Sequence, residues 1–301
     1  MSIKRLIVIV GPTGSGKTDL SIRLARHYGA PILSTDSRQV YRGMPIGTAQ
    51  PTTEQLHAVE HHFIASHDVH DRLSCGEYEV QALACLKGLF AKHDFVVAVG
   101  GSGLYVRALC EGMDDLPQAD ESLRRELEQR LAAEGIEALA AQLQMLDPDY
   151  YVVVDKSNPA RVMRALEVCM QTGLPYSQQR TGVRRERPFG ITKIGVDLPR
   201  DVLYDRINRR VDAMIAEGLV DEARRMYPYR TLNALQTVGY KELFDWFDGL
   251  TSYEEAVERI KRNTRRYAKR QLTWFRHDQE IQWFSPTDDA KMIKYIDFGI
   301  S

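Results

Sequence analysis

The chain has 301 residues, 44% of them hydrophobic, and a formal net charge of −1, which fits a globular protein of one large domain or two smaller ones. The balanced charge excludes a globally basic nucleic-acid binder, so any polyanion must be held by local charge. The four cysteines lack a Cys-x-x-Cys spacing, which disfavours a zinc site, and no apolar run is long enough to span a membrane, so we expect a cytoplasmic protein.

The first predicted strand, Arg5–Val10, leads directly into a phosphate-binding loop. Its Gly-x-x-x-x-Gly-Lys-Thr pattern lets consecutive backbone N–H groups surround a polyphosphate. Lys17 would add a positive charge, Thr18 would hold a magnesium ion through its hydroxyl, and a helix over residues 19–27 would add its dipole. The predicted diphosphate-binding residues are Gly11, Pro12, Thr13, Gly14, Ser15, Gly16, Lys17 and Thr18. A plain Gly-rich turn is the alternative, and it leaves the Lys-Thr pair unexplained.

The following segments predict an α/β fold, a P-loop NTPase-like parallel sheet covered by helices, with a helical insertion. Further strands are expected at residues 31–34, 95–99 and 191–198, and a helix at 78–93. Residues 118–145 are rich in Ala, Leu and Glu, and a second helix begins at Asn158-Pro159 and ends at Gly173. The expected catalytic core is therefore 1–115 with 190–301, and the insertion is 116–189.

An acidic residue is missing where an NTPase of this class would place one. The strand at 95–99 ends in glycines, and Asp94 precedes the strand, at its wrong end. Asp36 follows the strand at 31–34 and should face the same cleft as the phosphate-binding loop, because ligands collect outside the carboxyl ends of parallel strands. The pattern predicts diphosphate binding without nucleotide hydrolysis; an Asp36 that only caps a turn is the alternative.

Blocks spread over nearly the whole chain resemble those of the tRNA dimethylallyltransferases (tRNA isopentenyltransferases). They lie at residues 11–18, 36–49, 61–62, 100–105, 158–167, 238–240 and 264–276. The resemblance implies transfer of a dimethylallyl group from dimethylallyl diphosphate to N6 of the adenosine immediately 3′ of the tRNA anticodon, with release of diphosphate and help from Mg²⁺. Such a reaction breaks a bond at carbon and needs no activated water, which accounts for the missing acid.

The same resemblance implies roles for individual residues. Asp36 would be the general base for the N6 proton, and Thr18 and Arg210 would stabilise the departing diphosphate. The implied tRNA-contacting positions are Asp36, Ser37, Arg38, Gln39, Ser102, Arg124, Ala160, Arg161, Val162, Met163 and Arg164. Ser102 stands where the family usually has Thr and keeps the hydroxyl. From the residues alone, Arg124 could instead be an ordinary ion-pair residue, and Arg210 a solvated one like Arg209.

A helix predicted to begin near residues 251–255 carries a basic run. Residues 259–276 hold eight Lys/Arg and no Asp/Glu. Three residues recur at a spacing of seven and would face the core: Ile260, Tyr267 and Trp274. Arg262 and Arg266 lie on one of the remaining stripes and are expected to contact tRNA phosphates, because so many uncompensated cations would repel one another without a polyanion. A merely solvated face is the alternative.

Two other functions stay open on the sequence alone: a P-loop kinase acting on a small metabolite, and a non-catalytic RNA-binding switch that uses a nucleotide to change shape. A metal site at the histidines of residues 61–70 is disfavoured because their spacing fits no common ligand pattern. The sequence does not indicate the tRNA set, the donor chain length, or whether a nucleotide binds the loop. A monomer is expected.

Overall fold

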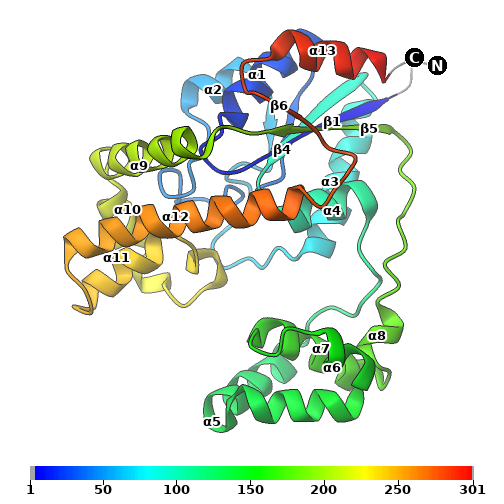
Figure 1. The fold of residues 1–301 in the computed structure, drawn as a ribbon, viewed down its shortest axis with the longest axis vertical. Coiled ribbons are helices and arrows are strands. Elements are labelled where there is room, and N and C mark those ends of the chain that lie inside the picture. The colour runs from blue at the N-terminus through cyan, green and yellow to red at the C-terminus, as the bar shows by residue number, and fades with distance from the viewer. Residues whose placement is uncertain (1–3, 300–301) are drawn as a thin grey trace. The chain divides into compact units, whose positions relative to one another are not determined.

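The structure is a computed structural model that describes residues 4–299. The chain divides into two compact units, Met1–Glu111 with Glu186–Ser301, and Gly112–Arg185 (Figure 1). The second unit begins and ends a few residues before the expected insertion, 116–189. None of the helices in the described part of the chain is long and apolar enough to cross a membrane.

The first unit is built on a parallel sheet with the strand order β3-β2-β4-β1-β5-β6. The strands are β1 (Arg5–Val10), β2 (Ile32–Ser34), β3 (His61–His62), β4 (Phe95–Gly100), β5 (Gly190–Val196) and β6 (Gln282–Phe284). The predicted α/β class with a parallel sheet is confirmed. Strands β3 and β6, of two and three residues, were not predicted.

Helices cover both faces of this sheet, as Figure 1 shows. The helices of this unit are α1 (Lys17–Tyr28), α2 (Thr53–Ala58), α3 (Cys75–Phe90), α4 (Gly103–Glu111), α9 (Arg200–Ala216), α10 (Leu219–Met226), α11 (Tyr240–Phe247), α12 (Tyr253–Phe275) and α13 (Asp289–Phe298), with 3₁₀ turns at Tyr227–Tyr229 and Asn233–Leu235. Side chains of the fully buried strand β1 alternate: Leu6 and Val8 pack toward α3 and α4, and Ile7 and Ile9 toward α1 and α13.

Local signals explain where several helices begin and end. Helix α3 begins before the predicted residue 78 because Ser74 and Glu77 form a capping box. Gly29 ends α1 in the left-handed conformation, at φ +58°. Ser252 caps α12 by accepting the Glu255 N–H.

The expected core-facing stripe of α12 is only partly correct. Ile260 is buried, but Trp274 is 43% exposed. A spacing of seven residues drifts by about 20° per heptad on a straight α-helix, so residues two heptads apart are offset around the helix by about 40°. The residues of α12 that are buried near its end are instead Ala268, Gln271 and Phe275.

The second unit is entirely helical, as the sequence predicts. It contains α5 (Glu121–Leu146), α6 (Pro148–Val153), α7 (Pro159–Thr172) and α8 (Tyr176–Gln179), packed around a small leucine-rich core. Asn158 caps α7 through its side chain and Gly173 ends it at φ +70°, both at the predicted positions. Gly135, at φ +81°, kinks α5.

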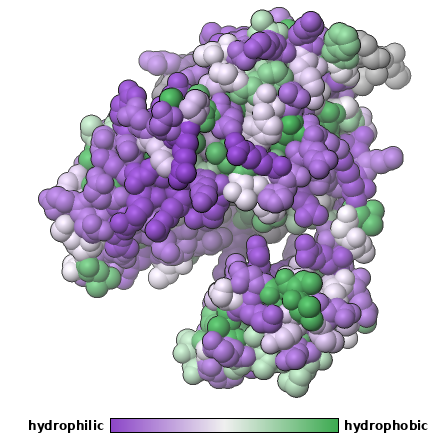
Figure 2. Space-filling model, viewed as in Figure 1, coloured by the Kyte–Doolittle hydropathy of each residue, from purple (hydrophilic) through white to green (hydrophobic). Residues whose placement is uncertain are grey.

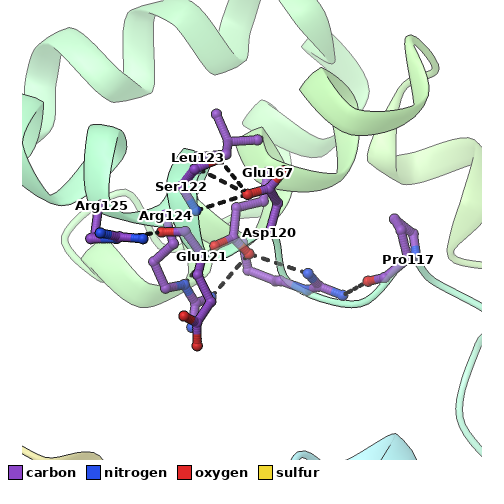
Figure 3. A network of polar contacts seen from close by, with 9 residues as sticks. Pro117, Asp120, Glu121, Ser122, Leu123, Arg124, Arg125 and Glu167 are labelled. Atoms are coloured by element: carbon purple, nitrogen blue, oxygen red, sulfur yellow. Dashed lines mark hydrogen bonds and ion pairs between the residues drawn. The ribbon is translucent and has the colours of Figure 1, made fainter.

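A buried carboxylate joins two helices of this unit (Figure 3). Glu167 on α7 is fully buried and accepts a bidentate pair from Arg124 on α5, at 2.5 and 2.9 Å. It also accepts from Arg164 at 3.2 Å, and Arg164 donates to the Pro117 carbonyl at 2.7 Å. The ion-pair role that the local sequence left open for Arg124 is therefore present, but its partner lies on α7 and not in its own acidic helix, so the pair fixes α5 against α7.

Replacing Glu167 by Gln should destabilise this unit by roughly 2 kcal/mol, because both arginines lose a charge-assisted acceptor. Hydrogen exchange of the α5 and α7 amides in the full chain would measure it, with β1 amides as the internal standard. The control is Glu134→Gln. Glu134 pairs with Arg130 one turn earlier on α5, and the Glu134 side chain is 45% exposed, so its replacement should destabilise the unit by less than about 0.5 kcal/mol. Equal protection losses in the two variants would contradict the assigned role of Glu167.

Candidate active site

The phosphate-binding loop joins β1 to α1, and its backbone requires glycine. Gly14 and Gly16 have φ of +84° and +90°, in the left-handed region. A Cβ at Gly11 would lie 2.5 Å from the Val196 carbonyl oxygen. Gly16 is the N-cap of α1 and leaves the first helical N–H groups without a side-chain cap. The loop thus presents the backbone donors and the positive helix end that an anion requires.

Lys17 and Arg210 place two cations at this loop. The Lys17 ammonium donates to the Pro12 carbonyl at 2.7 Å, and Arg210 Nη2 donates to Thr13 Oγ1 at 2.5 Å. Burial and the neighbouring Arg210 lower the pKa of Lys17 to about 7, and the Asp36 carboxylate opposes this shift. Burial also lowers the pKa of Arg210, again opposed by Asp36. The structure therefore brings Lys17, Arg210 and Asp36 together from three distant segments.

The neighbouring Arg209 behaves differently. Its side chain is 74% exposed and pairs with Asp205 one turn earlier on α9. The solvated role that the sequence left open for Arg210 therefore belongs to Arg209.

Asp36 sits at the start of a tight turn of residues 36–39, called the Asp36 turn below. Its Oδ1 accepts the N–H groups of Arg38 at 2.9 Å and Gln39 at 3.3 Å. Its Oδ2 has no hydrogen-bond partner within residues 4–299. One oxygen therefore caps the turn, as the alternative interpretation expected, and the other is available to a substrate.

The carboxyl end of β4, beside the loop, has no room for an acidic residue. Gly100 ends β4 against Thr35, and a Cβ at Gly100 would lie 2.4 Å from Thr35 atoms. Asp94 lies at the opposite end of β4, where it pairs with Lys4 at 2.8 Å. The end of β4 therefore lacks, for a steric reason, the strand-end acid by which a nucleotide hydrolase prepares water.

Comparison with known proteins decides the family. Residues 39–278 match the family model described as IPP transferase. The chain belongs to the IPP transferase family. It is 51% identical over 297 residues to the tRNA dimethylallyltransferase of Christiangramia forsetii and 47% identical over 300 residues to tRNA dimethylallyltransferase 1 of Bacteroides fragilis. These alignments cover 98% of both chains in the first case and 100% of both in the second.

Solved structures support the same family assignment. The crystal structure of the full-length tRNA isopentenylpyrophosphate transferase from Bacillus halodurans is 40% identical, with a TM-score of 0.73. The match covers 99% of this chain and 97% of that one. The resemblance inferred from the sequence blocks is thus confirmed at the level of the family and its fold.

The residues near Asp36 that the family resemblance assigns to tRNA contact are joined to one another and to neighbouring loops by short polar contacts. Ser102 Oγ accepts the Ser37 N–H at 2.9 Å and donates to Ser37 Oγ at 3.0 Å. Arg38 Nη1 donates to the Asn233 carbonyl at 2.6 Å, and Gln39 Nε2 to the Ala49 carbonyl at 2.8 Å. The Asp36 turn is therefore held from both sides, and Ser102 lies directly against it.

Sequence reasoning missed Gln271 on α12. Its side chain is buried, at 5% exposure, and contacts both the phosphate-binding loop and the residue that follows β4. A single polar residue between Arg270 and Leu272 gives no local sign of such contacts. The only available signal was its place on the buried side of a long amphipathic helix.

More of the basic residues of α12 are paired with acidic residues than the sequence suggests. Acidic residues of other elements pair with part of it: Arg259 with Asp245, Lys261 with Asp212, and Arg276 with Asp197. Arg262 approaches Glu255 at 3.6 Å. Within residues 4–299, Arg265, Arg266, Lys269 and Arg270 have no ion-pair partner, and Arg265 donates only to the neutral Asn208. Hydrophilic side chains cover the face over α9 and α12 (Figure 2), and these four cations are the remaining reason to expect a polyanion there.

The histidines of residues 61–70 have local partners. His62 lies 3.0 Å from Glu60 and His70 lies 2.6 Å from Asp68, while His61 contacts the Val59 carbonyl. Across the described part of the chain, no group of three or more His, Cys, Asp or Glu could hold a metal ion.

Proposed function

We propose that this protein transfers a dimethylallyl group from dimethylallyl diphosphate to N6 of the adenosine immediately 3′ of the tRNA anticodon, releasing diphosphate. The observation that carries the proposal is the meeting of Lys17, Arg210 and Asp36 beside a strand end that has no hydrolytic acid. Relatives named tRNA dimethylallyltransferase over the full length of the chain support it.

The two cations and the loop amides suit a departing diphosphate. As the carbon–oxygen bond of the donor breaks, its electron pair leaves with the diphosphate, whose growing charge Lys17, Arg210 and the backbone N–H groups neutralise. The allylic carbon forms its new bond with N6, and the N6 proton passes to Asp36 Oδ2. A carboxylate at that place also selects adenine, because guanine presents a carbonyl oxygen at the equivalent position.

The adenine must leave its stack to reach Asp36. Enzymes that act on a base extrude it into a pocket, and an anticodon loop is already single-stranded, which lowers the cost. We propose that the Asp36 turn and Ser102 hold the extruded nucleotide. Further contacts would come from Arg124, from the first turns of α7 (residues 160–164), and from Arg262 and Arg266 on α12.

Thr18 fits a magnesium ion that is bound jointly with the substrate. Its hydroxyl lies in the first turn of α1 and makes no hydrogen bond within residues 4–299. Mg²⁺ in phosphate sites usually keeps several waters and takes one or two protein oxygens plus phosphate oxygens, so a full protein cage is not needed. We propose Thr18 as the protein ligand; when bound, the ion supplies positive charge to the diphosphate oxygens.

The acceptor can be tested by locating the transferred group. The protein is incubated with carbon-labelled dimethylallyl diphosphate, Mg²⁺ and unmodified tRNA, and the tRNA is digested to nucleosides. We expect the label in N6-dimethylallyladenosine, and none when the adenosine 3′ of the anticodon is replaced by guanosine. Label in another nucleoside, or no label with a full set of unmodified tRNAs, would refute the proposal.

The proposed tRNA surface on α12 can be tested separately. Arg262→Ala with Arg266→Ala should weaken tRNA binding and flatten its log–log salt dependence by up to about two units, one for each tRNA phosphate that the variant no longer neutralises. Affinity for dimethylallyl diphosphate should not change. Filter binding across a salt series measures both.

Arg259→Ala is the matched control, because Arg259 lies on the same helix but is paired with Asp245 at 2.8 Å. Its salt slope should equal that of the wild type. An unchanged slope in the double variant would show that tRNA is held elsewhere, for which Arg161 and Arg164 are the first candidates.

A further inference from the structure

The carboxamide of Gln271 bridges two loops of the proposed active site. Its Oε1 accepts the Thr13 N–H of the phosphate-binding loop at 2.8 Å. Its Nε2 donates to the Gly101 carbonyl, just after β4, at 2.9 Å. One side chain thus satisfies a backbone donor of one loop and a backbone acceptor of the other.

Each of the two residues that Gln271 joins is connected in turn to a group of the proposed catalytic site. On one side, Thr13 is also held by Arg210, which donates to its hydroxyl at 2.5 Å. On the other side, Gly101 precedes Ser102, whose hydroxyl fixes Ser37 in the Asp36 turn. Gln271 therefore lies between the cation for the leaving diphosphate and the carboxylate for the incoming amine.

The carboxamide is tightly enclosed. A Cβ at Gly101 would lie 2.1 Å from Gln271 Nε2, so only glycine allows the carboxamide to come this close. Tyr267, one turn earlier on α12, lies beside the Gln271 side chain, and burial together with Asp36 raises the pKa of Tyr267 to about 12. Only a group that accepts and donates at once can make both bridging hydrogen bonds, which a carboxylate cannot do.

We propose that Gln271 is a positioning residue, which sets the distance between the diphosphate held by the phosphate-binding loop and the Asp36 carboxylate. The inference rests on the proposed function, because its consequence is the alignment of the donor carbon with N6. A misplacement of about 1 Å between reacting groups can cost on the order of a hundredfold in rate.

The first test is Gln271→Met, which keeps the volume and removes both hydrogen bonds. We expect single-turnover transfer to fall by roughly 10- to 100-fold, with tRNA affinity close to the wild-type value. Gly101→Ala should displace the carboxamide and give the same loss. The double variant should then be no worse than either single variant, because both substitutions break the same bridge.

The transfer rate of Gln271→Glu should depend on pH in a way that a purely structural role of Gln271 would not produce. An ionised carboxylate cannot donate to the Gly101 carbonyl, but a protonated carboxyl group can replace the amide. The charged and titratable groups near it are Tyr267 and Arg270 on α12, Asp36 and Arg38 in the Asp36 turn, Arg210 on α9, and Lys17 in the phosphate-binding loop. Because these groups are present in both proteins, the ratio of the variant rate to the wild-type rate is measured, and it should rise as pH falls.

Asn263→Ala is the control, since Asn263 is also a partly buried amide on α12 but donates to Glu242 at 2.7 Å, remote from the loops. Its rate should match the wild type. The inference is overturned if the wild type transfers the dimethylallyl group and Gln271→Met does so at the same rate. It is also overturned if the ratio of the Gln271→Glu rate to the wild-type rate does not change with pH. Failure of the wild type to transfer would instead refute the proposed function.

Discussion

Asp36→Asn is expected to slow transfer by a hundredfold or more, while tRNA and dimethylallyl diphosphate bind with near wild-type affinity. The amide oxygen of Asn can still accept the N–H groups of Arg38 and Gln39, so the Asp36 turn should persist. Its amino group, however, cannot take the N6 proton in place of Oδ2, and loss of a general base typically costs 10²–10⁴-fold. Single-turnover rates at saturating substrates measure the effect without interference from product release.

Asp94→Asn is the matched control. Asp94 flanks the same sheet at its amino-terminal edge and pairs with Lys4, so its loss should leave the rate unchanged. If the rates of Asp36→Asn and wild type coincide, Asp36 serves only to cap its turn.

Lys17→Ala should nearly abolish transfer and strongly weaken donor binding, but leave binding of tRNA alone intact. Lys17 supplies a desolvated positive charge to the loop, and removal of one preorganised charge-stabilising donor costs on the order of 10²–10³-fold in rate. Calorimetry with the diphosphate and filter binding with tRNA separate the two affinities. Lys87→Ala, on the exposed side of α3, is the charge-matched control.

Because the pKa of Lys17 is lowered to about 7, the affinity for the diphosphate should depend on pH near neutrality. Below pH 7 the ammonium is charged before the donor binds, and above it the group is mostly neutral. Diphosphate affinity in the wild type should therefore fall as pH rises from 6 to 8. In Lys17→Arg the charge persists throughout, so a pH dependence as steep as that of the wild type would contradict this assignment.

The parts of the fold that the sequence predicts are those encoded by neighbouring residues. The Val/Ile run of β1 and the glycines before Lys17 determine the loop locally. Asn158 and Gly173 mark both ends of α7 in the same way. These features depend on propensity and capping, which a single sequence shows.

The features that the sequence does not predict depend on distant contacts. Gln271 acts on Thr13 across 258 positions, and nothing near either residue indicates it. The acidic partners of α12 come from α9 and α11 and from the end of β5, so a count of charges along the helix overestimates its free positive charge. Tyr267, predicted to face the core, is half-buried and lies beside Gln271 at the proposed site.

A donor labelled in both its allyl carbon and its phosphorus tests the central claim, which is that the phosphate-binding loop serves carbon transfer and not nucleotide hydrolysis. The reaction contains protein, Mg²⁺ and unmodified tRNA, with no nucleoside triphosphate. We predict that carbon label enters tRNA and phosphorus label appears as intact diphosphate in a one-to-one ratio. A strict requirement for ATP, with orthophosphate released in proportion to the product, would contradict the account.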